Sequence, residues 1–330
     1  MRKALIAGID WYERLPALGG CTRDARAVGS VLERNFDRSA NFAEPRLLLG
    51  ECGLTPVSRR ELRDAIEDLF TGDADIALLY FAGHGHIETT GGYICCSDTR
   101  DGDDGIAIED IVRFANASAA RNKVIILDSC HSGAAGNRPN NRPLAEISIG
   151  TTILTASEPH QYAMEGPDGG GGVFTTLLVD ALSGAAANLL GHVTPAAIYA
   201  YIDRSLGPWE QRPLFKTHVR SSVHLRKAAP PIPLADLLAL PVHFPTGDFD
   251  FALDPSYEPD RGQAIDLALP APDPAKTPIF ATLQRLAREG LVRPVGADHM
   301  YYAAMGSRSC RLTSVGEHWR SLAARNLIQV

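Results

Sequence analysis

The 330-residue chain lacks several features that would each point to a particular class of protein. It has no apolar run of the ~18 residues that a membrane-spanning helix needs. Its six cysteines are scattered, and no CxxC pair indicates a structural zinc site. Lysine is scarce, with five residues against 27 arginines, a bias typical of GC-rich prokaryotic genomes. Hydrophobic residues make up 45% and charged residues 22%, the composition of an ordinary soluble globular protein.

A secretion signal is also not recognised in the first residues, MRKALIAGID. The start is basic, but the apolar stretch that follows is short and no cleavage site follows it. A first core strand explains this segment better. We therefore expect a cytoplasmic protein, without membrane contact, whose cysteines are reduced.

The first 226 residues alternate strand-like apolar runs with amphipathic helices, a pattern typical of an α/β fold. Ser58 with Glu61 forms a capping box, and Thr22 is a candidate N-cap. The predicted order is a mostly parallel, about six-stranded sheet between helices. Strands are expected at 3–9, 46–50, 75–83, 123–129, 151–157 and 215–226, and helices at 22–36, 58–70, 173–184 and 194–206.

The last hundred residues divide by composition. Residues 227–277 hold ten of the 22 prolines, and the acids within them predict a linker or an irregular segment. The following residues, 278–330, carry a net charge of +4 and are expected to form a helix, a short hairpin with a glycine turn and a second helix. This small α+β pattern resembles a winged-helix module. We therefore predict three parts, 1–226, 227–277 and 278–330, because such charge asymmetry favours separate modules.

Two residues at strand ends carry the chemistry. His84 lies between two glycines in YFAGHGH, directly after the third predicted strand, and Cys130 follows the fourth in DSCHSG. Parallel neighbouring strands lie ~5 Å apart, so their carboxyl ends bring these residues together. A cysteine becomes a good nucleophile as a thiolate beside a base, which predicts a Cys–His dyad. The backbone N–H of Gly85 could then reach a developing oxyanion.

These motifs resemble the caspase-like clan of cysteine peptidases, in its metacaspase and bacterial caspase-like branch. The resemblance covers about residues 1–226 and includes GGCTRDA and GVFTTLLVDAL. It implies a caspase-like sandwich in which His84 is the general base and Cys130 the nucleophile, with the N–H groups of Gly85 and Cys130 as the oxyanion hole. It also implies an acyl-enzyme mechanism that requires no cofactor.

The same resemblance implies the substrate class. Metacaspases cut after arginine or lysine through acidic residues of the S1 pocket, which correspond here to Asp24 and Asp128. Two carboxylates favour a guanidinium and reject an acidic side chain. Read without the family, Asp24 could be a first-turn acid favoured by the helix dipole and Asp128 a structural strand-end residue. The chain has Ala82 where the family often has serine, so one polar group of the pocket is missing.

Many metacaspases are activated by calcium through acids that follow the histidine strand. The segment SDTRDGDDGIAIED supplies oxygen ligands of the type that calcium takes, although its spacing differs from the metacaspase pattern and from an EF-hand. The candidate ligands are Asp98, Asp101, Asp103, Asp104 and Glu109.

The sequence thus predicts an Arg/Lys-directed cysteine endopeptidase with a protein substrate. By family analogy we expect a monomer, which could be made as a latent zymogen. The expected setting is a bacterial stress, antiviral defence or regulated-death pathway. Residues 278–330 would contact an activating protease or a regulatory partner; their arginines leave nucleic acid open, although a solvated or protein-docking face is favoured. Two alternatives remain. One is a catalytically silent scaffold whose C-terminal module binds a protein or nucleic acid, and the other is hydrolysis of a non-peptide ester or amide.

Overall fold

The computed structural model describes residues 1–42, 44–53, 56–88, 91–129, 147–156, 172–207, 212–261 and 269–328. These residues form two units, Met1–Ala229 and Pro230–Val330, and each is described by itself. Among the described residues, no helix combines the length and apolar character needed to cross a membrane.

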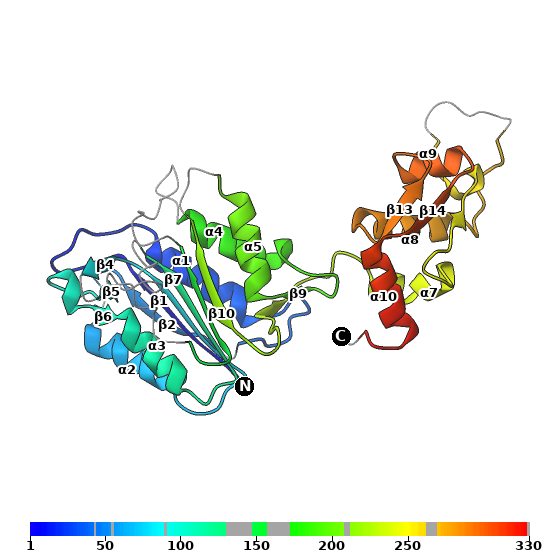
Figure 1. The fold of residues 1–330 in the computed structure, drawn as a ribbon. Helices are drawn as coiled ribbons and strands as arrows, with labels where there is room; N and C mark the ends of the chain where they lie inside the picture. The colour runs from blue at the N-terminus through cyan, green and yellow to red at the C-terminus, as the bar shows by residue number, and fades with distance from the viewer. Residues whose placement is uncertain are drawn as a thin grey trace. The chain divides into compact units, whose positions relative to one another are not determined.

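The first unit is built on a six-stranded sheet with the strand order β10-β8-β7-β3-β1-β2 (Figure 1). Five strands are parallel, and only β10 at one edge runs antiparallel to its neighbour. The predicted mostly parallel sheet of about six strands is therefore confirmed. The bounds of the strands are β1 Arg2–Ile9, β2 Arg46–Gly50, β3 Ile76–Ala82, β7 Asn122–Asp128, β8 Thr151–Thr155 and β10 Leu214–His218.

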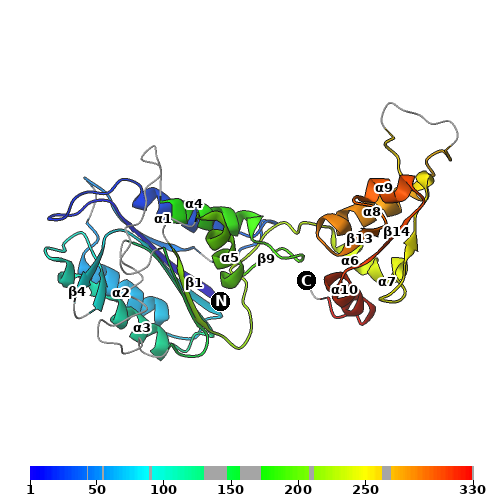
Figure 2. The ribbon, with the colours of Figure 1, turned by 45° about the horizontal axis from the view of Figure 1, so that its top comes forward.

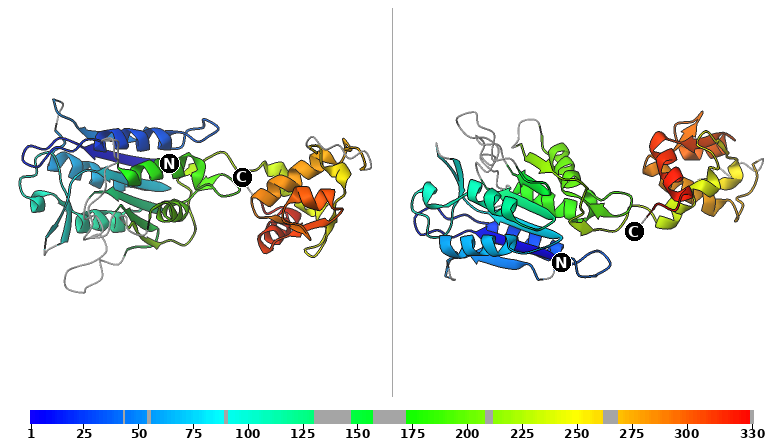
Figure 3. Two further views of the ribbon diagram at one scale, coloured as in Figure 1. Left: turned by 90° about the horizontal axis from the view of Figure 1, so that it is seen from above. Right: turned by 60° about the horizontal axis from the view of Figure 1, so that its bottom comes forward.

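Helices cover both faces of this sheet (Figures 1 and 2). The helices form two groups, one on each face. Alternate residues of a strand point to opposite faces, so Tyr80 of β3 packs into the core under the first group and Phe81 into the core under the second. Figure 3 gives two further views of the ribbon, in which the helices on both faces of the sheet can be followed. The first group is α1 (Cys21–Glu33), α4 (Val173–Asp180) and α5 (Pro195–Ser205), and the second is α2 (Arg59–Phe70) and α3 (Ile108–Ala117).

The two predicted caps have different outcomes. Ser58 caps α2 as predicted, since its hydroxyl accepts the N–H of Glu61 at 3.2 Å. The prediction of Thr22 as the cap of α1 is wrong, because the helix begins at Cys21. Asp10, the residue after β1, instead supplies the hydrogen-bond acceptors for the first N–H groups of α1. Its carboxylate accepts the N–H groups of Gly20, Cys21 and Thr22.

Two further features of the first unit differ from the prediction or lie beyond it. The alternating run 215–226 is not one strand, because β10 ends at His218 and a separate short strand, β11 (Arg226–Lys227), pairs with β9 (His192–Val193). A small antiparallel sheet, β4-β5-β6, stands between His84 and α3 in the chain. Its strands, which the sequence analysis does not predict, are β4 Gly85–Glu88, β5 Gly91–Ile94 and β6 Ile106–Ala107.

The second unit combines short helices with a three-stranded antiparallel sheet, β12-β14-β13. The two strands β13 and β14 pair as a hairpin, but α9 joins them where the sequence suggests a glycine turn. The winged-helix resemblance stays a prediction. The elements are α6 Leu234–Leu238, α7 Leu240–His243, β12 Phe251–Ala252, α8 Thr277–Arg288, β13 Val292–Val295, α9 Met300–Met305, β14 Ser309–Leu312 and α10 Ser314–Ala324.

The segment 227–277, predicted as a linker or an irregular segment, largely belongs to this unit, and the division of the chain falls at 229/230. The physical reason is charge pairing, because acids of this segment bind basic residues that follow it. The Asp236 carboxylate, which is buried, accepts two bonds from the Arg285 guanidinium. A second two-bond pair joins Arg311 to Asp250. The opposite net charges of 227–277 and 278–330, from which we predicted separate modules, thus form ion pairs within one unit.

The approach of α1 to β1 predicts a large effect of one added methyl group. A Cβ at Gly8 would lie 2.3 Å from the carbonyl oxygen of Cys21 and 2.7 Å from Cβ of Ala25. Overpacking of this kind costs about 1–3 kcal/mol. We expect Gly8→Ala to lower the melting temperature by several degrees in thermal unfolding followed by circular dichroism. Gly19→Ala, where no atom lies within 4 Å of the added carbon, is the control and should melt like the parent.

Candidate active site

His84 stands two residues beyond the end of β3, on a turn that only glycine permits. Gly83 has a φ of 159°, and a Cβ there would lie 2.7 Å from the Tyr12 hydroxyl and 2.9 Å from the Phe81 ring. The close packing explains the first glycine of the GHG motif. It also brings the backbone of His84 against Tyr12.

The imidazole of His84 is held in one orientation by the loop after β1. Its Nε2 lies 2.8 Å from the carbonyl oxygen of Pro16, and its backbone N–H donates to the Tyr12 hydroxyl at 2.8 Å. The Tyr12 ring lies 4.7 Å from the imidazole, between centroids. Because a carbonyl oxygen only accepts, Nε2 carries the proton of the neutral ring, and Nδ1 is the nitrogen that can act as a base. Sequence analysis missed both Tyr12 and Pro16.

The chain leaving β7 runs beside the chain leaving β3. Ala82 is the register partner of Asp128, and the N–H of Gly83 donates to the Asp128 carbonyl at 3.3 Å. Ser129, the next residue, is buried. Cys130, the predicted nucleophile, lies outside the described residues. The described register brings the segment that leads to it next to His84, and the dyad itself stays a prediction.

The backbone N–H of Gly85 is directed away from the small sheet. Gly85 faces Ile94 in the β4–β5 pair, and the carbonyl of the preceding residue, His84, accepts the N–H of Cys95 at 2.9 Å. In an antiparallel pair, hydrogen-bonded and non-hydrogen-bonded residue pairs alternate. Gly85 therefore belongs to a non-hydrogen-bonded pair, and its N–H points to the side opposite β5. This orientation suits the predicted oxyanion contact.

The two acids predicted for the S1 pocket are brought together and are both about nine-tenths buried. Asp24, from the first turn of α1, is 8% exposed, and Asp128, at the end of β7, is 9% exposed. Both border Gly172. Its N–H donates to an Asp24 carboxylate oxygen at 2.8 Å, and a Cβ on it would lie 2.9 Å from Oδ2 of Asp128. A side chain at this position would fill the space over the acids.

The environment raises the pKa of both carboxyl groups. Burial, together with the nearby charge of Asp24, raises the pKa of Asp128 to about 7, although the Thr175 hydroxyl donates to it at 2.5 Å and acts in the opposite direction. Tyr80 in turn donates to Thr175 at 2.6 Å. Burial also raises the pKa of Asp24, against the stabilising N–H of Gly172. Two buried like charges without a cation are costly, and a bound guanidinium would lower both pKa values.

The acids proposed for calcium are not gathered into a metal site. Among the described residues, no group of three or more histidine, cysteine, aspartate or glutamate side chains could hold a metal ion. Asp98 instead accepts the N–H of Arg59 at 2.8 Å, near the start of α2. Asp103 and Asp104 lie in a short turn at Gly102–Asp104, and Glu109 lies in the first turn of α3. Calcium dependence stays a prediction, and no step of the chemistry below uses the ion.

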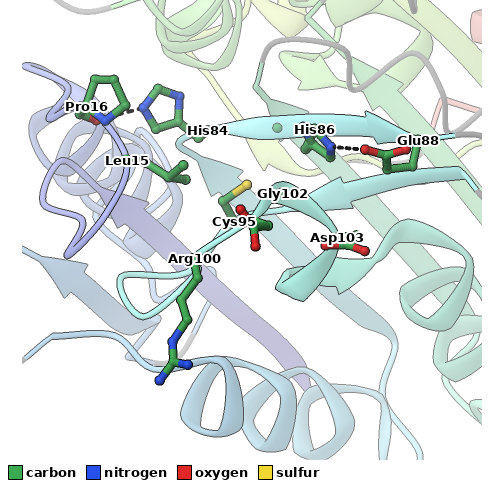
Figure 4. Close-up of a pocket in the computed structure, with 11 residues that line it drawn as sticks. Leu15, Pro16, His84, His86, Glu88, Cys95, Arg100, Gly102 and Asp103 are labelled. Atoms are coloured by element: carbon green, nitrogen blue, oxygen red, sulfur yellow. Dashed lines mark hydrogen bonds and ion pairs between the residues drawn. The ribbon is translucent and has the colours of Figure 1, made fainter.

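A pocket of about 520 Å³ opens beside His84 (Figure 4). His84 and Gly85 line it at one end, together with Leu15 and Pro16. The rest of the lining is largely polar and comes from β4 and the turn that follows β5; its polar residues are His86, Glu88, Arg100, Asp101 and Asp103.

Comparison with known proteins gives a family and a fold. A family model for the caspase domain matches residues 1–223, which lie within the first unit. A crystal structure of a protein from Geobacter sulfurreducens is 17% identical with a TM-score of 0.50, and the match covers 69% of this chain and 98% of that one. Caspase-1 from Spodoptera frugiperda is 14% identical with a TM-score of 0.49, covering 69% of this chain and 91% of that one. No curated protein gives a significant match. At these identities the structural likeness concerns the fold alone.

The raised pKa of Asp128 predicts a specific effect on stability. Between about pH 4, the ordinary range of an unfolded aspartate, and about pH 7, the folded chain holds a proton that the unfolded chain has lost. Stability therefore falls as pH rises through this window, because the native state binds more protons. We expect Asp128→Asn to remove this fall, so that its free energy of unfolding gains on the parent between pH 4 and 7 in urea titrations. The exposed Asp73→Asn is the control, and a gain independent of pH would contradict the account.

Proposed function

Because the chain belongs to the caspase family of peptidases, we propose that it is a cysteine endopeptidase that cleaves after arginine or lysine. Cys130 is the proposed nucleophile and His84 its base. The single observation that carries the specificity is the buried pair of carboxylates, Asp24 and Asp128, which borders the carboxyl ends of the strands. Burial makes this pair unfavourable when it is empty and charged, so it favours a cationic side chain of the substrate.

In the proposed mechanism, Nδ1 of His84 takes the thiol proton of Cys130, while the bond from Nε2 to the Pro16 carbonyl holds the ring. The thiolate attacks the peptide carbonyl, and the N–H groups of Gly85 and Cys130 hold the oxyanion. The intermediate collapses when His84 protonates the leaving amine, which leaves an acyl-enzyme. Water then gives a proton to His84 and attacks the thioester. The C–S bond breaks, which releases the new carboxyl terminus, and the Cys130 thiolate takes the proton back from His84.

The orientation of His84 supports this sequence of proton transfers. In the neutral imidazole the Nε2 proton is donated to a carbonyl, which leaves Nδ1 as the single basic nitrogen. This bond disfavours the other tautomer, in which Nδ1 would carry the proton and could not act as the base. The Pro16 carbonyl also stabilises the imidazolium that forms when Nδ1 takes the proton. This backbone oxygen has the role of the carboxylate in Ser–His–Asp triads, although there the carboxylate binds Nδ1 and here the carbonyl binds Nε2.

The proposed setting is a bacterial stress, defence or regulated-death pathway, by analogy with caspase-like proteases that carry additional modules. The proposed role of the second unit is regulation or docking, through an activating protease or another protein partner. A monomeric state and a latent zymogen form are further parts of this proposal. The alternative of a silent scaffold is separated from it by the assays that follow.

Fluorogenic peptides that end in arginine, lysine or aspartate test the proposal. We expect cleavage after arginine and lysine but not after aspartate, and a loss of at least about a thousandfold in kcat/KM for Cys130→Ala and for His84→Ala. Parallel reactions with calcium and with a chelator decide calcium dependence. Cleavage after aspartate would overturn the specificity. If neither the intact chain nor chain nicked by limited proteolysis cleaves any of these peptides, the catalytically silent scaffold would be favoured.

The ionisation of Asp128 predicts a pH dependence of arginine cleavage. Its pKa of about 7 means that the free enzyme has a fully charged acid pair only above neutral pH. We expect kcat/KM for an arginine peptide to rise between pH 6 and 8 through this group, in addition to any rise from the dyad. Thr175→Val removes a donor to the carboxylate, so the midpoint should move to higher pH, whereas Thr175→Ser keeps the hydroxyl and should retain it. An identical midpoint in Thr175→Val would contradict the assignment.

A further inference from the structure

The pocket beside His84 and the buried acids lie toward opposite faces of the central sheet. Asp128 bonds to Thr175 of α4, and Asp24 belongs to α1, so both acids lie on the α1/α4 side. Cys95, which lines the pocket, is part of the core shared with α2 and α3. His84, just beyond the carboxyl end of the interior strand β3, therefore lies between the two sites.

This arrangement assigns a direction to a bound peptide. An arginine side chain that enters the acid pair occupies one side of His84, and the amine that His84 protonates leaves on the side of the scissile bond away from that arginine. We propose that the 520 Å³ pocket binds the residues that follow the scissile bond and that it favours a basic side chain there. This inference rests on the proposed function, and it adds a second determinant of specificity.

The charges around the pocket support a preference for a base. Asp101 and Asp103 are exposed, and neither forms an ion pair with another described residue. Glu88 lies 2.9 Å from Nε2 of His86, whose charge depends on its protonation. Figure 4 shows the guanidinium of Arg100 directed away from His84. Three carboxylates thus line a pocket in which, among the described residues, Arg100 is the one permanently charged cation, and the charge of His84 and His86 depends on protonation.

The far wall of the pocket is set by close packing rather than by loose side chains. The ring of His86 lies against Gly102, where a Cβ would come within 1.8 Å of the imidazole Cγ. The turn that carries Asp101 and Asp103 is therefore packed directly against β4, the strand that begins at Gly85. The turn thus holds Asp101 and Asp103 in the lining of the same pocket as His84.

Internally quenched peptides test this inference. Each carries arginine before the scissile bond and lysine, alanine or glutamate at the first or the second position after it. Exposed ion pairs each change an equilibrium by a small factor. With two carboxylates in the pocket, we expect kcat/KM to be about three- to tenfold higher for lysine than for glutamate at one of these positions. The ratio should shrink as salt is raised from about 0.05 to about 0.5 M.

Matched variants assign the preference to the pocket. In Asp101→Asn/Asp103→Asn the lysine-to-glutamate ratio should fall close to 1. Asp104→Asn removes one charge from the same turn at a residue that does not line the pocket, and it should keep the ratio. All reactions contain a chelator, or the same fixed calcium concentration if the enzyme requires it, so that calcium does not alter the comparison. An unchanged ratio in the double variant would overturn the assignment to these residues.

An arginine aminocoumarin amide, which has no residue after the scissile bond, separates the two proposals. Cleavage of this substrate together with a lysine-to-glutamate ratio of 1 or below would overturn the inference and leave the proposed function intact. Failure of the chain to cleave either the amide or the peptides, before and after limited proteolysis, would overturn both.

Discussion

The register between β3 and β7 is the constraint on which the site depends. Because Ala82 faces Asp128, the two chains leave the sheet side by side, one toward His84 and the other toward Cys130. The same register turns the Asp128 carboxylate to the α4 side, where Asp24 arrives from α1. A shift of one residue would move every side chain of a strand to the opposite face. The positions of His84 and of Asp128 thus follow from one strand pairing.

The acid pair lowers stability where the proposed function places substrate recognition. Asp128 is buried beside another carboxylate, and its raised pKa measures the cost of keeping it ready for a cation. Thr175 and Tyr80 reduce this cost with hydrogen bonds, and Gly172 leaves the space above the acids open. Such strain is characteristic of functional sites, where perturbed carboxyl groups gather.

The sequence predicted those parts of the molecule that depend on local pattern. Buried apolar runs identified the central strands, and the Ser58 cap followed from its capping box. Features that depend on distant partners were missed: Asp10 reaches across to cap α1, and Tyr12 and Pro16 act on His84 through a hydroxyl and a backbone carbonyl. No motif marks such contacts. Sequence analysis left open whether 227–277 is a linker or an irregular segment for a related reason, since its acids meet Arg285 and Arg311 only in the folded unit.

Covalent trapping of the active-site cysteine tests the central claim most directly. A peptidyl-arginine acyloxymethyl ketone and its aspartate counterpart would each be incubated with the full chain, and the modified residue identified by peptide mass spectrometry. The account predicts rapid labelling of Cys130 by the arginine probe, slow labelling by the aspartate probe, and loss of this preference in Asp128→Asn. Faster labelling of Cys130 by the aspartate probe would contradict the role of the buried acid pair, and labelling of another cysteine alone would contradict the dyad.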